Sequence, residues 1–547
     1  MINKIRENKL FTVVVILIGL FLFASITYYA VFSDSWFDET NYGYKSWLVA
    51  EGLAQPFVDF GTKYPPVALY SQTFIQDVFG PSTFSARILS GFFLLGVIFL
   101  IFDMLRRRGG KWLGLLGVSL ITFHTYTIVK YIAAIPNAMI VFLGLLSIWF
   151  LHIKRLKVWQ SIALSSVAMS MAVLVRYNLL PALVVLWFFV LFKYRSPKYF
   201  ILSLLVSFAT IGVLIVPYLI LDAEHALSYF LAMFGPLTAL FPLDFFSLGS
   251  GVADNSSGSI LNFFFNEGRL KIVMQVLTTY FHIWAILFSG LLMAVYKWRG
   301  NIKVFFDKNS FLVLNFMFVI LLFLAHFFFG PNRHKINVLY FVPFMVLSAS
   351  YILHIVYSKF VDAGVWDKVR GVIVPLIVAV IILASFSIAI SGNDTIFFNR
   401  FDYSDTDLNR VNRGASYLES VTTFDDVILT IDNPDHVFIA GRYMIPERIN
   451  RHDSYTDSDD EVLLKRFAHY NTNMFLVWLK EDTDVFVVQR GTFNERLEPI
   501  SGGTDLVTDV ENILSTQYNF AGSIEGVYPR KDNRSGIMDI YRKKDDK

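Results

Sequence analysis

The sequence predicts a polytopic α-helical membrane protein that ends in a smaller α/β domain. Of its 547 residues, 55% are hydrophobic and only 17% are charged, and the mean hydropathy is +0.53. Water-soluble chains average about 25% charged residues. Apolar runs long enough to cross a hydrocarbon core of about 30 Å recur up to residue 391. Beyond that point no such run occurs, and acidic residues outnumber basic ones.

Eleven membrane spans can be placed along the chain. The first run follows Lys4, Arg6 and Lys9, is too long for a signal-peptide core and is followed by no small-residue cleavage site, so we expect it to be retained. The predicted spans are residues 10–32, 87–105, 112–129, 133–151, 159–176, 178–192, 199–221, 273–296, 309–329, 336–357 and 371–391.

The basic residues predict the orientation of these spans. Cytoplasmic loops are enriched in Lys and Arg. The clusters are Arg106–Lys111, Lys154–Lys157, Lys193–Lys198, Lys297–Lys303 and Lys359–Arg370. All of them fall on the side of the N-terminus, so we predict a multi-pass cell-membrane protein with a cytoplasmic N-terminus. Residues 1–392 would form the membrane domain, with external loops at 33–86 and 222–272.

Residues 393–547 are predicted to form an external, soluble α/β domain. The β-branched runs Val427–Ile431 and Val485–Val488 are typical of buried strands. Residues 408–422 and 460–469 have the spacing of amphipathic helices. Strands that alternate with helices indicate an α/β arrangement, and a segment of about 150 residues can bury its own core.

Several classes of function lack support in this sequence. It contains no cysteine, which excludes thiol chemistry and thiolate metal sites. It contains neither a Gly-x-Gly-x-x-Gly motif nor a Walker-type phosphate loop. The net charge of +3 is no nucleic-acid signature, because the basic residues are concentrated in loops on one side of the spans. We therefore expect no nucleic-acid partner.

An acid pair, Asp38 and Glu39, lies on the predicted loop after the first span. Aromatic rings partition to the membrane interface, so Trp36 and Phe37 would hold this stretch there. Partial desolvation would then raise the basicity of a carboxylate, as a general base requires. Tyr42 follows closely and could line a substrate site. The alternative interpretation is an ordinary solvated loop.

Cationic side chains recur at the outer ends of the predicted helices. Lys63 begins the motif Lys63-Tyr64-Pro65-Pro66, whose prolines would either aim it at an anion or only start an interfacial helix. Arg176 lies on a tight outer turn, and Arg333 and Lys335 precede span 336–357. These cations suit a phosphate at headgroup depth or, alternatively, anchor the chain among headgroups. Arg87 is interpreted as an interfacial residue whose charge reaches the headgroups.

These motifs together resemble those of the C-type-fold membrane glycosyltransferases. The similarity is to the dolichyl-phosphate-mannose protein mannosyltransferases and the lipid A aminoarabinose transferases. The similarity covers roughly residues 10–195, and it is weaker in the span that contains Tyr340 and Pro343. The motifs in family order are Asp38-Glu39, Gly52…Pro56…Asp59, Lys63-Tyr64-Pro65-Pro66 and Phe79-Gly80-Pro81-Ser82…Ser85-Ala86-Arg87.

The resemblance implies a hexosyl- or pentosyltransferase. It would move a sugar, with inversion, from a dolichyl- or undecaprenyl-phosphate donor to a glycan, lipid or protein acceptor on the external face. Asp38 and Glu39 would be the catalytic pair, with Asp38 as the base by position. The cations that hold the donor phosphate would be Lys63, Arg176, Arg333 and Lys335. The residues that line the substrate would be Tyr42, Tyr64, Tyr177 and Asn137.

No cofactor is obligatory in this scheme, although Asp38 and Glu39 could hold a divalent metal ion. Relatives often carry an acid where this chain has Asn137, which cannot act as a base. The Trp-Trp-Asp-Tyr-Gly signature of oligosaccharyltransferases is absent from the sequence. The alternative function is a transporter or lipid-linked-saccharide flippase. Such a protein would place ionisable groups at mid-depth of paired, interrupted spans, whereas most charges here lie near span ends.

Overall fold

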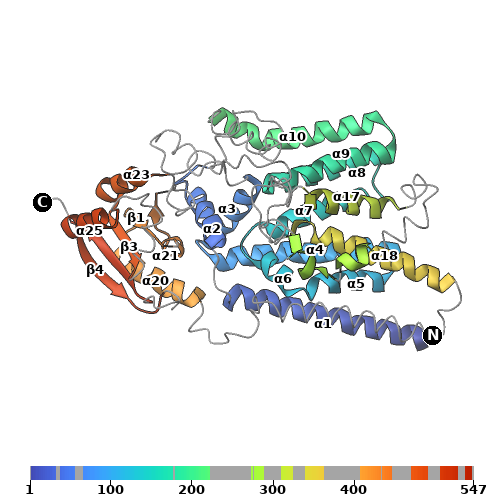
Figure 1. The fold of residues 1–547 in the computed structure, drawn as a ribbon, viewed down its shortest axis with the longest axis horizontal. Helices are drawn as coiled ribbons and strands as arrows, with labels where there is room; N and C mark the ends of the chain where they lie inside the picture. Colours follow the sequence, from blue (N-terminus) through green and yellow to red (C-terminus); the bar gives the residue numbers. More distant parts are fainter. Residues whose placement is uncertain are drawn as a thin grey trace.

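The computed structural model consists of a bundle of long helices with a mixed β-sheet at one end (Figure 1). It describes residues 2–32, 37–55, 66–176, 179–221, 273–274, 276–281, 283–288, 309–324, 339–362, 407–432, 434–445, 470–490, 506–527 and 536–544. The N-terminus lies at the end of the bundle farthest from the sheet, and the C-terminus lies beside the sheet (Figure 1).

The apolar helices follow the predicted spans. Among the described residues, four helices are long and apolar enough to cross a membrane: α1 (Ile2–Phe32), α4 (Thr83–Gly109), α8 (Val158–Val175) and α10 (Pro197–Leu221). Shorter apolar helices are α7 (Asn137–Phe150), α9 (Leu180–Tyr194), α17 (Ser310–Leu324) and α18 (Val342–Asp362). The predicted span 371–391 lies outside the described residues, so the count of eleven stays a prediction.

Helix α4 is the central element of the bundle. Its N-terminus is capped by Ser82, whose Oγ accepts the Ser85 N–H at 3.2 Å, and Gly110 ends it with a φ of 87° that favours glycine. Its close packing against the next helix depends on a missing side chain, because a Cβ on Gly117 would lie 2.2 Å from a Leu105 methyl group. The glycine therefore sets the approach of the two helices.

The span predicted at 112–129 corresponds to two helices separated by a sharp bend. The chain forms α5 (Lys111–Thr122) and α6 (Thr125–Ile132), whose axes differ by 80°. His124 makes this break favourable, because its Nδ1 accepts the Thr127 N–H at 3.4 Å and its ring stacks on Tyr280 at 4.4 Å. Apolarity alone carries no signal for such a cap. As a result, α6 and the turn after it run across the bundle.

Two helices that carry the polar motifs lie between the bundle and the sheet (Figure 1). They are α2 (Phe37–Ala50) and α3 (Pro66–Phe79), and they pack against each other. The acid pair was expected on a loop, but Asp38 and Glu39 form the first turn of α2. Negative charge is favourable at a helix N-terminus, which explains this start. The prolines do begin a helix, since α3 starts at Pro66.

The C-terminal segment forms a five-stranded sheet in the order β2-β1-β3-β5-β4. Strands β2, β1 and β3 run parallel, while β5 is antiparallel to both β3 and β4. The strands are β1 (Val427–Thr430), β2 (Tyr443–Met444), β3 (Val485–Gln489), β4 (Tyr518–Ile524) and β5 (Met538–Lys543). The helices around them are α20 (Asp407–Val421), α21 (Asp435–Ile439), α23 (Thr472–Val477) and α25 (Leu506–Gln517).

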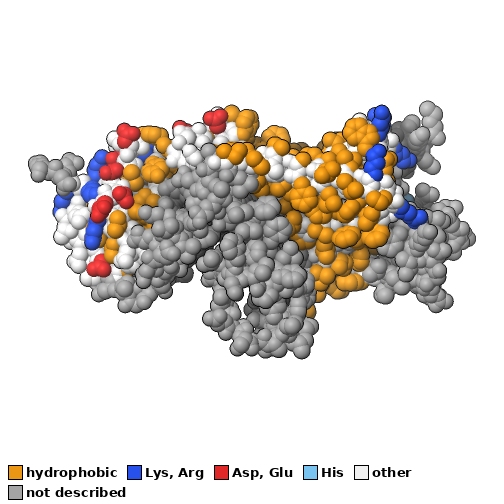
Figure 2. All heavy atoms as spheres, turned by 90° about the horizontal axis from the view of Figure 1, so that it is seen from above, with side chains coloured by type: hydrophobic (Ala, Val, Ile, Leu, Met, Phe, Trp, Pro, Cys, Tyr) orange, Lys and Arg blue, Asp and Glu red, His pale blue; other side chains and the backbone are white. Residues whose placement is uncertain are grey.

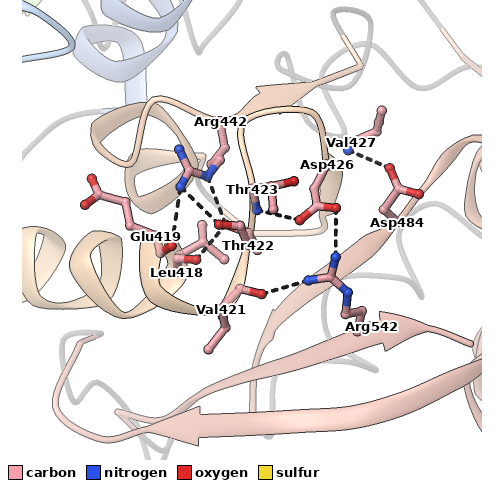
Figure 3. Close-up of polar contacts among 10 residues, drawn as sticks. All are labelled: Leu418, Glu419, Val421, Thr422, Thr423, Asp426, Val427, Arg442, Asp484 and Arg542. Carbon is pink, nitrogen blue, oxygen red and sulfur yellow. Dashed lines mark hydrogen bonds and ion pairs between the residues drawn. The ribbon is translucent and has the colours of Figure 1, made fainter.

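The two predicted strands and the helix predicted at 408–422 are confirmed by β1, β3 and α20. The helix predicted at 460–469 lies outside the described residues. Figure 3 shows how arginines tie the end of α20 to the sheet: Arg542 contacts Asp426 at 3.0 Å and the Val421 carbonyl at 2.9 Å. Arg442 donates from Nε to the Thr422 hydroxyl at 2.9 Å.

The sheet segment packs directly on α2. One continuous buried apolar cluster contains Tyr44 and Trp47 of α2 together with Phe438 and strand residues such as Ile540. The Tyr44 hydroxyl donates to the Arg442 carbonyl at 2.7 Å, and the Thr40 hydroxyl donates to the Asp435 carboxylate. The C-terminal sheet segment therefore also helps to fix the position of α2, the helix that carries the acid pair.

This packing predicts the effect of a side chain at Gly43, where a Cβ would lie 2.9 Å from the Phe438 ring. We expect Gly43→Val to lower the free energy of unfolding by about 1–3 kcal/mol, because overpacking forces the two surfaces apart. Thermal unfolding of the purified full chain measures this loss. Gly19→Val is the matched control in α1, where nothing lies within 4 Å. Equal effects of both substitutions would contradict the tight contact.

Candidate active site

The two acids of α2 have opposite environments. Adjacent residues of a helix point about 100° apart. Glu39 is directed inward and is 1% exposed, whereas the neighbouring Asp38 is exposed. The Glu39 carboxylate is therefore buried inside the protein, and the Asp38 carboxylate is accessible from outside it.

Glu39 forms a two-pronged ion pair with Arg87 of α4. Arg87 Nε lies 2.9 Å from Glu39 Oε1, and Arg87 Nη2 lies 2.7 Å from Glu39 Oε2. Arg87 Nη1 donates to the Tyr29 carbonyl at 3.2 Å, and its guanidinium carbon lies 4.9 Å from the centre of the Tyr29 ring. The prediction that Arg87 is an interfacial residue is wrong: its side chain is 1% exposed, because a buried carboxylate neutralises it.

The same carboxylate fixes the turn between α6 and α7. Glu39 Oε1 also accepts the Ala134 N–H at 2.6 Å, and the Ala134 carbonyl accepts from Gln72 Nε2 of α3 at 3.0 Å. Helices α1, α2, α3, α4 and this turn thus meet in one hydrogen-bonded group. Buried charges require such complete satisfaction, since each unpaired charge in a low-dielectric interior is costly.

The exposed acid lies beside a second predicted site residue, Tyr42. The two occupy positions i and i+4 and share a face of α2. Burial raises the pKa of the Tyr42 hydroxyl to about 12, the nearby Arg176 guanidinium opposes this shift, and the nearby Asp38 carboxylate adds to it. Asp38, Tyr42 and Arg176 are therefore neighbours, although they come from distant parts of the sequence.

Arg176 ends α8, and its guanidinium carbon lies 5.4 Å from the centre of the Tyr340 ring. Tyr340 immediately precedes α18 and is fully buried. The structure thus brings a carboxylate, a guanidinium and two phenol rings together near the N-terminus of α2. This combination can accept a proton from a hydroxyl group and stabilise an anion close by.

Asn137 is a structural residue of the turn between α6 and α7. It is fully buried at the start of α7, and its Nδ2 donates to the Lys130 carbonyl at 3.2 Å. Its Oδ1 is buried and makes no hydrogen bond in the described part of the chain. Asn137 therefore positions the α6–α7 turn whose Ala134 amide binds Glu39.

Two buried lysines near the site were missed by the sequence analysis. Lys45 is fully buried and occupies position i+7 relative to Asp38, on the face that also carries Tyr42. Lys130, in the last turn of α6, is 4% exposed, and its Nζ lies 5.6 Å from the Tyr126 ring centre. The i, i+4, i+7 spacing of an acid, a tyrosine and a lysine would have revealed the first of them.

The remaining predicted residues cannot be placed. Lys63, Tyr64, Tyr177, Arg333 and Lys335 lie outside the described residues, so their roles stay predictions. No group of three or more histidine or carboxylate side chains that could hold a metal ion occurs among the residues that the structure describes. Glu39 is buried and hydrogen-bonded to Arg87 and to the Ala134 amide, whereas Asp38 is exposed.

The chain is similar to a known protein family and to several solved structures. The family model for dolichyl-phosphate-mannose-protein mannosyltransferases matches residues 63–220. No curated protein matches the chain. The crystal structure of ArnT from Cupriavidus metallidurans in the apo state is similar with a TM-score of 0.56 and 13% identity, over 98% of this chain and 98% of that one.

Two further structures are similar over most of the chain. ArnT bound to undecaprenyl phosphate matches with a TM-score of 0.56 and 13% identity, over 97% of both chains. The apo oligosaccharyltransferase of Archaeoglobus fulgidus matches with a TM-score of 0.52 and 13% identity, over 93% of this chain and 73% of that one. Together, the family match and the shared fold confirm the resemblance that the sequence indicated, to the C-type-fold membrane glycosyltransferases related to dolichyl-phosphate-mannose-protein mannosyltransferases and ArnT.

Proposed function

We propose that this protein transfers a sugar from a polyprenyl-phosphate donor to an acceptor hydroxyl group on the external face of the membrane. The observation that carries the proposal is the exposed Asp38 beside Arg176 and Tyr42, on a helix whose register is fixed by the buried Glu39–Arg87 pair. Solved relatives support the donor class: ArnT was crystallised with undecaprenyl phosphate and the archaeal oligosaccharyltransferase with dolichol phosphate.

In the proposed reaction, Asp38 removes the proton of the acceptor hydroxyl as its oxygen attacks the anomeric carbon. The bond between that carbon and the phosphate oxygen breaks, and the sugar inverts. The leaving group is a lipid phosphate that is already anionic, so it needs cations rather than a proton donor. Arg176 supplies one, and Lys63, Arg333 and Lys335 are the further candidates from the sequence.

Glu39 acts as a positioning residue in this proposal. Its side chain is fully buried and bound by Arg87 and the Ala134 amide, so it does not face the solvent side on which Asp38 lies. Its role is to fix the first turn of α2 and so the direction of Asp38. The scheme uses no obligatory metal ion, because the proposed cations would hold the charge that develops on the leaving phosphate.

The tail is proposed to help select the acceptor. The sheet segment packs on the face of α2 that carries Tyr44 and Trp47, whereas Asp38 and Tyr42 occupy another face of the helix. This arrangement places the C-terminal segment close to the acid without contributing any of the described residues around it.

The substitution Asp38→Asn tests the general base. Asparagine is nearly isosteric but cannot accept the proton, so turnover should fall by about 10²–10⁴ while expression and donor binding persist. The assay follows radiolabelled polyprenyl-phosphate sugar. Asp77→Asn, an exposed acid on α3, is the matched control and should retain wild-type turnover. Near-native turnover of the Asp38 variant would remove this carboxylate from the mechanism.

The buried ion pair predicts that Glu39→Gln and Arg87→Gln reduce stability, in contrast to Asp38→Asn. Each leaves one buried charge unpaired, so each should lower the free energy of unfolding by about 3–5 kcal/mol. The double variant should lose clearly less than the sum of the two, because it buries no unpaired charge. Denaturation of all three variants measures the coupling. Strictly additive losses would contradict a direct pair.

Arg176→Gln tests the anion-binding role. A charge-assisted contact to phosphate contributes about 1.5–3 kcal/mol, so the donor Kd should rise about tenfold or more. Direct binding of the lipid donor to the purified variant measures this change. Arg155→Gln, an exposed arginine in the turn after α7, serves as control. Unchanged donor affinity in a folded Arg176 variant would assign this residue to structure alone.

A further inference from the structure

A second group of cationic and polar side chains lies at the end of the bundle opposite Asp38. Helix α4 has 27 residues, with Arg87 near its start and Arg108 near its end. At 1.5 Å per residue these two arginines are about 30 Å apart. At this far end, Arg108 of α4, His152 after α7 and Lys193 of α9 come together.

Aromatic rings hold these three side chains. The guanidinium carbon of Arg108 lies 3.9 Å from the centre of the Phe311 ring and 5.5 Å from that of Tyr351. The edge of the His152 ring meets the same Phe311, with ring centres 5.3 Å apart. Lys193 Nζ lies 5.3 Å from the Phe189 ring and donates to the Leu151 carbonyl at 3.4 Å. Such contacts orient the cations but do not neutralise them.

The carboxylate of Asp103, at the same end of α4, is already paired with other residues. Asp103 accepts from Arg106 at 2.8 Å, from Arg107 at 2.6 Å and from Trp149 Nε1 at 2.9 Å. Within the described parts of the chain, no ion pair involves Arg108 or Lys193. Arg108 and Lys193, which are partly buried and lie near each other, therefore have no carboxylate partner among the residues that the structure describes.

His152 supplies a second, independent observation. Burial and the nearby Lys193 and Arg108 lower its pKa to about 3, so the ring is neutral. Its Nδ1 lies 2.8 Å from the Ile148 carbonyl and must carry the ring proton, because a carbonyl only accepts. Nε2 is therefore an acceptor, and it is buried without a hydrogen-bond partner among the described residues. Buried acceptors in proteins are normally hydrogen-bonded, so this nitrogen is available to a donor group of a ligand.

We propose that Arg108, Lys193 and His152 form a binding site for an anionic phosphate group that also carries a hydroxyl. The guanidinium and ammonium groups bind the anionic oxygens, and the hydroxyl donates to His152 Nε2. A phospholipid headgroup such as phosphatidylglycerol has this chemistry, and so does dihydrogen phosphate. Basic pockets between membrane helices are known to take phospholipid headgroups.

The position of the proposed site in the molecule is consistent with the binding of a lipid headgroup. Figure 2 shows Lys and Arg side chains at the end of the apolar surface that lies away from the sheet. Exposed lysines and arginines such as Lys154 and Arg155 only mark the membrane boundary. Arg108 and Lys193 differ from them because both are partly buried against aromatic rings.

Thermal unfolding of the full chain in uncharged detergent tests the site. Phosphatidylglycerol should raise the Tm of the wild type by a few degrees, because a ligand that binds only the folded state stabilises it. Arg108→Gln and Lys193→Met should lose most of this response. Lys154→Met and Arg155→Gln are the matched controls and should keep it. Phosphatidylcholine, which has no net charge, should give no response in any variant.

Two further arms identify the ligand. Phosphatidylmethanol carries the same anionic phosphate without a hydroxyl, so it should stabilise the wild type less, and His152→Phe should respond equally to both lipids. A response to inorganic phosphate as well would show that a soluble anion also fits the site. The site is refuted if neither anion raises the wild-type Tm, or if Arg108→Gln and Lys193→Met respond like the wild type.

Discussion

The buried ion pair between Glu39 and Arg87 is the interaction on which the rest of the site depends. Moving a carboxylate and a guanidinium out of water is costly, and only well-aligned partners recover that cost. The geometry here meets the condition, with two direct contacts of 2.9 and 2.7 Å and a third from the Ala134 amide at 2.6 Å. A rotation of α2 that moved Glu39 would leave Arg87 unpaired, so the helix has one register.

That register gives each face of α2 a separate task. Glu39 faces the membrane helices, Tyr44 and Trp47 face the sheet segment, and Asp38 remains exposed. One apolar cluster joins α2 to the sheet, so α2 and the C-terminal segment share a buried core. Removal of the C-terminal segment would expose large apolar side chains of the helix that carries the proposed base.

The two ends of the bundle use charge in different ways. Near Asp38, a carboxylate and a guanidinium lie close together, which suits a reaction in which one group accepts a proton and the other holds an anion. At the far end of α4, Arg108 and Lys193 lie on aromatic rings, and no ion pair of either is found among the described residues. The first arrangement favours chemistry, and the second favours the binding of an anion.

The sequence by itself determined the class of the protein and located the acid pair that contains the proposed base. Hydropathy located the apolar helices, β-branched runs located β1 and β3, and the order of short motifs indicated the family resemblance. These features are local, since each depends on composition or spacing within a few dozen residues. Only the tertiary structure decided the partners of these groups, such as Glu39 with Arg87 and Arg176 with Tyr340. Hydropathy reports whether a charge is expensive in an apolar environment, but not which distant charge will neutralise it. For that reason the sequence assigned Arg87 to the interface, while the folded chain buried it against a carboxylate. The bend at His124 within the predicted span 112–129 likewise depends on a contact with the distant Tyr280.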